Sequence, residues 1–134
     1  MILNSSIGKL IYSDNPYKLI VSVESDIGDF YRSLIPKYLD VRKPMHAPHI
    51  STVRNETPNN LSVWGKYEGQ DVEFQYDSFI YNDDVYYWIN CFSSTLEEIR
   101  QELGLPTTSQ FTRSPDGKHK FHITIGNIKH LKKF

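Results

Sequence analysis

Two short segments of the chain carry the same arrangement of a histidine and a hydroxyl residue. The first is His49-Ile50-Ser51 and the second is His122-Ile123-Thr124, each with apolar neighbours. Successive side chains of a β-strand point to opposite faces. The histidine and the hydroxyl residue of each motif would therefore share one face of a strand, and the isoleucine between them would point to the other face.

Two imidazoles that face one another are suited to in-line displacement at phosphorus. One of His49 and His122, in its neutral form, would remove a proton from the attacking oxygen, while the other, protonated, would give a proton to the leaving oxygen. The hydroxyl groups of Ser51 and Thr124 would hydrogen-bond the non-bridging phosphate oxygens and hold the phosphorus between the histidines. Such a site requires no metal or other cofactor, and its rate would show a bell-shaped dependence on pH.

The elements that must position these motifs are predicted in two similar series. In the first series, strands at 7–12 and 17–23 and a helix at 26–35 precede the His49 strand, which runs to about residue 54. In the second, a strand at 85–92 and a helix at 95–103 precede the His122 strand. Shorter strands are predicted at 61–64, 72–76, 79–81 and within 107–112.

Each of the two helices has its own local signal. The apolar face of the first helix is predicted from helical spacing to consist of Ile27, Phe30, Tyr31, Leu34 and Ile35. Ser25 or Asp26 is the expected cap at its start. The second helix would begin with a capping box at Ser94 and end at Gly104, which can adopt a left-handed conformation.

The repeated order of elements predicts one α+β domain, 1–134, made of two βαβ-like halves at roughly 7–60 and 72–130. A pseudo-twofold axis between the halves would bring the two His-x-Ser/Thr faces together across a cleft. The duplication, more than either motif alone, predicts a shared site.

Charge and cysteine content exclude several classes of protein. The formal net charge is −1, from 15 Lys and Arg against 16 Asp and Glu, so the broad basic surface of a nucleic-acid-coating protein is absent. Cys91 is the single cysteine, which rules out an intramolecular disulfide and favours a reducing compartment. No apolar run approaches the ~20 residues of a membrane helix. We expect a cytoplasmic protein.

The paired motifs resemble those of the 2H phosphoesterase superfamily, which is named for two His-x-Thr/Ser motifs and includes RNA 2′,3′-cyclic phosphodiesterases and bacterial ligase-like enzymes. The resemblance rests on His49, Ser51, His122 and Thr124 and extends, through the half-repeat, over most of the chain. It implies mostly antiparallel sheets that form a central groove, with two main helices on the outside. It also implies catalysis by the two histidines and phosphate binding by the two hydroxyl residues.

Segments 31–37, 49–54 and 121–127 are similar to the compact phage branch of that superfamily, which includes the anti-CBASS phosphodiesterase. This similarity implies cleavage of 3′,5′ linkages in the cyclic di- and trinucleotide signals of bacterial antiviral defence, in the host cytoplasm. An RNA 2′,3′-cyclic phosphodiesterase would use the same four residues. A third alternative is a non-catalytic protein that sequesters a cyclic nucleotide.

Aromatic and basic side chains are further candidates for substrate binding. The chain has nine Tyr, seven Phe and two Trp, and nucleobases bound without sequence readout commonly stack on such rings. The candidates for stacking are Tyr12, Trp64, Tyr87 and Trp88, and the candidates for offsetting phosphate charge are Arg54, Arg113 and Lys120. For each of them, packing or solvated surface is the alternative interpretation.

A zinc site is the chemical alternative, because His-x-x-His spacing also occurs twice, at His46 with His49 and at His119 with His122. On a helix these pairs would share a face, but on a strand residues three apart point to opposite faces. The lone cysteine adds little to a four-ligand set. The sequence therefore favours a metal-free site. The resemblance implies a cyclic nucleotide or short RNA as its partner, and we expect no DNA duplex and no membrane as partners.

Overall fold

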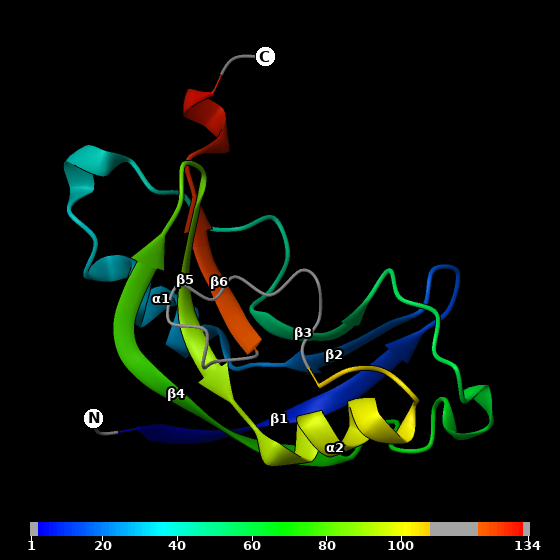
Figure 1. The fold of residues 1–134 in the computed structure, drawn as a ribbon. Coiled ribbons are helices and arrows are strands. Elements are labelled where there is room, and N and C mark those ends of the chain that lie inside the picture. Colours follow the sequence, from blue (N-terminus) through cyan, green and yellow to red (C-terminus); the bar gives the residue numbers. More distant parts are fainter. Residues whose placement is uncertain (1–2, 108–120, 133–134) are drawn as a thin grey trace.

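Antiparallel strands form the frame that carries both motifs (Figure 1). The computed structural model describes residues 3–107 and 121–132. Its strands are β1 (Asn4–Ser13), β2 (Lys18–Ser22), β3 (His49–Arg54), β4 (Asp71–Asn82), β5 (Tyr86–Phe92) and β6 (Phe121–Asn127). Its α-helices are α1 (Ser25–Ser33) and α2 (Ser94–Glu102), and short 3-10 helices lie at Lys37–Leu39, Leu61–Val63 and Lys129–Leu131.

The strands close into a barrel in the order β1-β2-β3-β6-β5-β4, and every pair is antiparallel. The α+β class and the antiparallel pairing are therefore as expected. Two details differ from expectation. The strands joined through each helix are antiparallel neighbours, so neither half is a parallel βαβ unit, and the sheet closes on itself instead of forming separate sheets around a groove.

The barrel interior is filled by apolar side chains from all six strands. They include Leu10, Leu19, Val21, Ile50, Val53, Val72, Phe74, Ile89, Ile123 and Ile125, all buried. Because side chains alternate along a strand, the motif residues on either side of Ile50 and Ile123 point to the outer face, the side of the sheet turned away from this core. None of the described helices is long and apolar enough to cross a membrane.

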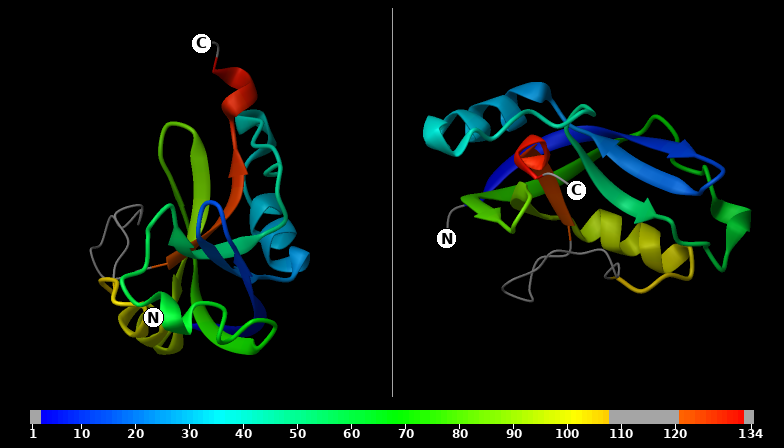
Figure 2. Two further views of the ribbon diagram at one scale, coloured as in Figure 1. Left: turned by 90° about the vertical axis from the view of Figure 1, so that its right-hand side faces the viewer. Right: turned by 90° about the horizontal axis from the view of Figure 1, so that it is seen from above.

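The two helices lie on different sides of the barrel (Figure 2). Helix α1 contacts β6, and α2 contacts β3. Helix α1, which precedes β3 in the chain, therefore contacts the second motif strand, and α2, which precedes β6, contacts the first.

The apolar stripe predicted for the first helix is only partly correct. Tyr31 and Ile35 are buried, but Phe30 and Leu34 are each 57% exposed, and α1 ends at Ser33. A short helix packed against a sheet buries a narrow stripe, so the outer residues of a wide apolar face stay in solvent. The expected cap is also wrong, because the residue before the helix is Glu24 and no side chain caps the helix start.

Helix α2 begins one residue earlier than predicted. Its cap is Ser93, whose hydroxyl accepts a hydrogen bond from the Leu96 backbone N–H, in place of Ser94. Gly104 adopts φ +76°, the left-handed conformation expected after the helix. Segment 61–64 is a further correction, since it forms a 3-10 turn instead of a strand.

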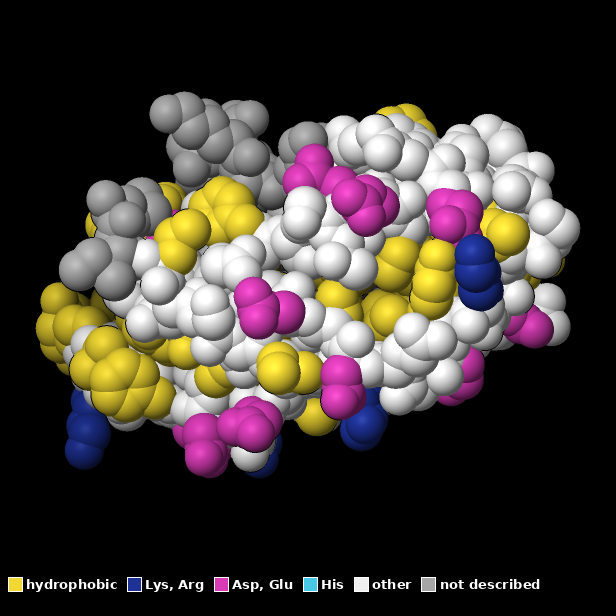
Figure 3. Space-filling model, turned by 90° about the horizontal axis from the view of Figure 1, so that it is seen from below, with side chains coloured by type: hydrophobic (Ala, Val, Ile, Leu, Met, Phe, Trp, Pro, Cys, Tyr) yellow, Lys and Arg dark blue, Asp and Glu magenta, His cyan; other side chains and the backbone are white. Residues whose placement is uncertain are grey.

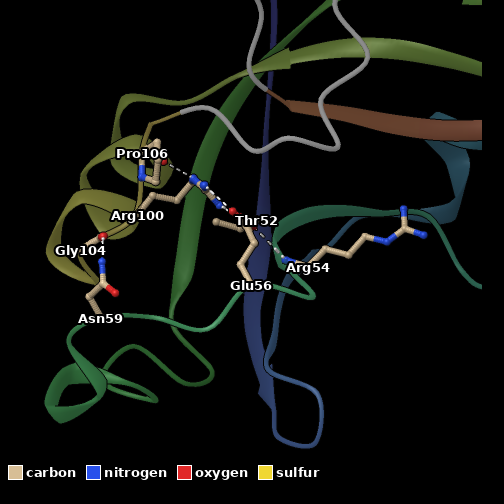
Figure 4. A network of polar contacts seen from close by, with 7 residues as sticks. All are labelled: Thr52, Arg54, Glu56, Asn59, Arg100, Gly104 and Pro106. Carbon is tan, nitrogen blue, oxygen red and sulfur yellow. Dashed lines mark hydrogen bonds and ion pairs between the residues drawn. The ribbon is translucent and has the colours of Figure 1, made fainter.

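The reason for that turn lies in the loop before it. The Asn60 N–H bonds the Leu103 carbonyl at 3.0 Å, and Asn59 Nδ2 donates to the Gly104 carbonyl at 2.7 Å (Figure 4). These bonds attach the loop to the end of α2. An extended segment needs a hydrogen-bonding neighbour, and no described strand pairs with 61–64. The strand predicted within 107–112 lies, except for its first residue, outside the described residues.

Candidate active site

The two motifs come together where β3 pairs with β6. Ile50 and Ile123 are Cα partners in this antiparallel pair, and both side chains are 0% exposed in the core. The histidine and hydroxyl residue on either side of each isoleucine therefore lie on the outer face. All four are partly exposed, which gives a ligand access to them.

The register sets the arrangement of these four residues. One step from the Ile50–Ile123 pair, His49 lies opposite Thr124, and one step in the other direction Ser51 lies opposite His122. Directly opposite residues have Cβ atoms ~4.5–5.5 Å apart, and diagonal neighbours lie ~7–8 Å apart. The residues thus form a quadrangle with histidines at one pair of opposite corners and hydroxyls at the other. We call this the His/hydroxyl quadrangle.

The ring of His49 is oriented by the backbone just before the strand. Its Nδ1 lies 2.9 Å from the Ala47 carbonyl oxygen. A carbonyl oxygen can only accept a hydrogen bond, so Nδ1 carries the proton. In the neutral ring the lone pair then resides on Nε2, the nitrogen left for proton exchange with a ligand.

Each motif strand carries a β-bulge directly after its hydroxyl residue. Between β2 and β3 the register moves from Ile20–Ser51 to Leu19–Val53, which leaves Thr52 as the extra residue. Between β5 and β6 it moves from Trp88–Thr124 to Tyr87–Gly126, which leaves Ile125 as the extra residue. Bulges bend a strand and redirect side chains, and they are frequent beside functional sites.

A buried arginine from α2 fixes the first bulge (Figure 4). Arg100 is 0% exposed and its Nη1 donates to the Thr52 carbonyl at 2.8 Å. The same guanidinium forms two hydrogen bonds with the Glu56 carboxylate, at 2.9 and 2.8 Å, and Nε donates to the Pro106 carbonyl at 2.6 Å. The fork geometry of arginine satisfies all these acceptors at once.

The second bulge has a matching contact from α1. Arg32 Nη1 donates to the Ile125 carbonyl at 3.0 Å, and its Nη2 is paired with Asp29. Arg32 and Arg100 both lie in the last turn of their helices. The sequence interpretation did not single out either arginine. When α1 and α2 are aligned from their first residues, the two arginines fall one position apart.

Two of the predicted substrate-binding residues lie away from the quadrangle. Tyr12 and Trp64 are in edge-to-face contact, with 4.9 Å between ring centroids, and Trp64 Nε1 donates to Asp14 Oδ1 at 2.8 Å. Tyr12 pairs with Leu19, which points into the core, so Tyr12 also faces the interior. The motif residue Ser51 lies on the opposite, outer face of the sheet. Burial raises the pKa of the Tyr12 hydroxyl. Their role in binding stays a prediction.

Two other candidates share the outer face with the motifs. Trp88 is the Cα partner of Thr124, and its ring centroid lies 6.4 Å from that of His122. Arg54, at the end of β3, is exposed and extends away from Arg100 (Figure 4). Tyr87, by contrast, is partly buried against the core.

Three further sequence candidates fall on residues that the structure does not describe. Arg113, His119 and Lys120 lie outside the described residues. Within residues 3–107 and 121–132, no cluster of three or more His, Cys, Asp or Glu side chains is placed to hold a metal.

Two cavities elsewhere on the described chain are poorly suited to a phosphate. One, of ≈ 170 Å³, is lined by Asp71 of β4 together with Glu98 and Glu102 of α2. The other, of ≈ 300 Å³, includes Glu24 and Asp71 in its lining. Figure 3 shows acidic side chains spread over the face seen from below in the view of Figure 1, with few basic ones. An anionic ligand would be repelled from this side.

Comparison of the chain with models of protein families, with curated proteins and with solved structures found no match.

Proposed function

We propose that this chain is a metal-independent phosphodiesterase of the 2H type that cleaves the 3′,5′ linkages of cyclic di- and trinucleotides. The observation that carries the proposal is the β3–β6 register, which alternates two histidines and two hydroxyls around one point of the outer face. A phosphate at that point would have an imidazole on each of two opposite sides. In-line displacement requires that arrangement, because the attacking and leaving oxygens lie on opposite sides of the phosphorus.

In the proposed reaction the ribose 2′-hydroxyl of the substrate attacks the adjacent phosphorus. His49 Nε2 accepts the hydroxyl proton, since the bond between Nδ1 and the Ala47 carbonyl leaves Nε2 basic in the neutral ring. His122, protonated, gives its proton to the 5′-oxygen as the P–O bond to that oxygen breaks. The products are a 2′,3′-cyclic phosphate end and a free 5′-hydroxyl. Ser51 and Thr124 donate hydrogen bonds to the non-bridging oxygens, whose negative charge they stabilise.

This proposal includes a finer description of the fold. The chain would consist of two duplicated halves, at roughly 7–60 and 72–130, related by a pseudo-twofold axis. Several features support it. The strand order is the same on both sides of the β3–β6 pair, and each helix contacts the motif strand of the opposite half. The bulges at Thr52 and Ile125 occupy equivalent places, and each bulge carbonyl accepts a hydrogen bond from an arginine, Arg100 or Arg32.

The biological role proposed with this activity is antagonism of CBASS-type anti-phage defence, in the cytoplasm of the host. It rests on the resemblance of segments 31–37, 49–54 and 121–127 to the compact phage branch. An RNA 2′,3′-cyclic phosphodiesterase and a nucleotide-sequestering protein would both place a phosphate at the same quadrangle. The experiment must therefore separate cleavage of each substrate from binding.

The test is a product assay with and without EDTA. The protein is incubated with cyclic di- and trinucleotides and, separately, with a 2′,3′-cyclic nucleotide, and the products are followed by chromatography. Cleavage of the 3′,5′ linkage that is lost in His49→Ala and in His122→Ala supports the proposal. The matched control is His130→Ala, because His130 Nε2 instead contacts Asp40 Oδ2 at 2.8 Å and should be dispensable.

Three results would contradict the proposed activity. Tight binding with intact ligand recovered on denaturation would identify a sequestering protein. Cleavage of the 2′,3′-cyclic nucleotide alone would identify the RNA-processing alternative. Activity abolished by EDTA and restored by zinc would overturn the metal-free mechanism.

A further inference from the structure

A continuous series of aromatic rings runs from β4 across β5 to the second motif. The centroids of Phe79 and Tyr81 are 4.6 Å apart, and those of Tyr81 and Trp88 are 6.2 Å apart with an interplanar angle of 21°. Trp88 in turn has its centroid 6.4 Å from the His122 ring. These contacts connect an exposed part of the sheet to a residue of the His/hydroxyl quadrangle.

The register places these rings on the same face as the motifs. Tyr81 is the Cα partner of Trp88, and Trp88 is the partner of Thr124, so the three side chains lie side by side on the outer face. Phe79, two residues before Tyr81, points in the same direction and is 61% exposed. A large apolar ring exposed to this extent, next to stacked rings, offers a stacking surface to a planar ligand.

A buried amide lies within the same group of side chains. Asn90 is 0% exposed and is the Cα partner of His122, and its Oδ1 accepts a hydrogen bond from Trp88 Nε1 at 3.1 Å. That bond fixes the orientation of the amide, because the indole nitrogen can only donate. Among the described residues, Asn90 Nδ2 is then left without a hydrogen-bond partner. A buried unpaired donor is uncommon in native proteins and requires an explanation.

We propose that Phe79, Tyr81, Trp88 and Asn90 form a nucleobase subsite beside the His/hydroxyl quadrangle, and this inference rests on the proposed phosphodiesterase function. One base of the substrate would stack on the exposed ring of Phe79 while its phosphate occupies the quadrangle. Asn90 Nδ2 would donate to an acceptor on the edge of that base. Since Asn90 is covered in the ligand-free chain, the base reaches Nδ2 only after neighbouring side chains rearrange.

The chemistry of Asn90 predicts which base is preferred. The unpaired group is a donor, so binding gains most where the base offers acceptors. Guanine presents two acceptors, O6 and N7, on one edge, whereas adenine presents N7 and an amino group that itself needs an acceptor. Asn90 Oδ1 already accepts from Trp88, so guanine is the expected base.

The stacking part is tested with guanosine 5′-monophosphate and ribose 5-phosphate, which differ only by the base. Titration followed by tryptophan fluorescence or calorimetry should show the nucleotide binding ~5- to 150-fold more tightly, the range of stacking on one ring system. Phe79→Ala should remove most of that difference and leave ribose 5-phosphate binding unchanged. The matched control is Phe30→Ala, since Phe30 is 57% exposed on α1 and is not part of the ring series.

Asn90→Asp tests the amide, because it keeps an oxygen acceptor for Trp88 Nε1 and removes the donor. In the native chain guanosine 5′-monophosphate should bind more tightly than adenosine 5′-monophosphate, and the variant should lose this preference. Should the variant fail to fold, the side-chain amide resonance of Asn90 in the native chain gives the same information. It should shift on addition of the guanine nucleotide and not on addition of ribose 5-phosphate.

Equal binding of nucleotide and ribose 5-phosphate, or equal effects of Phe79→Ala and Phe30→Ala, would overturn the subsite. An unchanged base preference in Asn90→Asp, or an unmoved amide resonance, would remove Asn90 from it. These outcomes are separate from those of the proposed reaction. If the base-dependent binding is found without any cleavage, the subsite stands and the phosphodiesterase falls. If the linkage is cleaved but Phe79→Ala leaves KM unchanged, the phosphodiesterase stands and the subsite is refuted.

Discussion

The buried ion pair between Arg100 and Glu56 gives the most quantitative test of the structure. Arg100→Met would keep the length and most of the apolar contact of the side chain but remove its charge. Glu56, whose side chain is only 13% exposed, would lose the guanidinium now 2.8 Å away. The carbonyls of Thr52 and Pro106 would each lose an N–H donor.

The expected cost follows from the carboxylate that is left behind. Loss of one partner of a buried ion pair destabilises a protein by ~3–5 kcal/mol, because the remaining group loses the opposite charge that offset its desolvation. For a domain of this size each kcal/mol lowers Tm by roughly 3–5 °C. Arg100→Met should therefore lower Tm by about 10–20 °C.

The assay is thermal and urea unfolding followed by circular dichroism. Glu56→Gln is combined with Arg100→Met in a double-mutant cycle. The double variant should lose less stability than the sum of the single variants, since neither charge of the pair remains. Lys9→Met is the matched control. Lys9 pairs with Asp71 at 3.0 Å with both side chains 63% exposed, so its loss should cost below ~1 kcal/mol.

Two results would refute this reasoning. A change of under ~1 kcal/mol in Arg100→Met would mean that the pair is solvated and does not hold the Thr52 bulge. An additive cycle would mean that Arg100 and Glu56 contribute independently. In either case Arg100 would not fix the bulge that directly follows Ser51.

Three other predictions concern titratable groups. His49→Ala and His122→Ala should each lower turnover by ~10²–10⁴, and native turnover should fall at both ends of a pH titration; a flat profile would contradict paired acid–base roles. Burial raises the pKa of the Cys91 thiol, so a disulfide reagent should modify it only as fast as the chain unfolds, and rapid labelling of the folded chain would contradict its burial. The hydrogen bond from His130 lowers the pKa of Asp40, so that contact should stabilise the fold above the ordinary carboxyl pKa and lose its effect as the pH falls through the lowered one. Carboxyl NMR titration should show a higher Asp40 pKa in His130→Ala, and an unchanged value would mean that the contact is absent in solution.

Local sequence signals were enough to predict most of the secondary structure. The strands that carry His49 and His122 and the left-handed Gly104 follow from residue types a few positions apart, because alternation, apolar spacing and turn chemistry act over short ranges. The same local alternation predicts that Ile50 and Ile123 point away from the motif residues, and both are buried in the core. The four proposed catalytic residues could therefore be named without knowledge of the fold.

The sequence could not specify which strands pair, because hydrogen bonds between distant strands leave no local pattern. The sheet closes into a barrel in which β3 lies beside β6, so His49 and His122 share one surface. The closure follows from the burial of side chains contributed by all six strands. The exposure of Phe30 was missed for the same reason, since helical spacing predicts an apolar face but not how much of it another element covers. Segment 61–64 has strand-forming residues, yet it forms a 3-10 turn, and the residue before it, Asn60, bonds the Leu103 carbonyl just after α2.

Tertiary contacts likewise decided which residues surround the two motifs. Arg100 acts on Thr52 from a helix far along the chain. Asn90 becomes a candidate only because β5 sets it beside His122 and because its Nδ2 has no partner within 3–107 and 121–132. The sequence alone determined which side chains could do chemistry and which face of a strand they share. Only the tertiary structure decided that β3 pairs with β6, through long-range burial and hydrogen bonding. This pairing brings the two motifs together in one His/hydroxyl quadrangle.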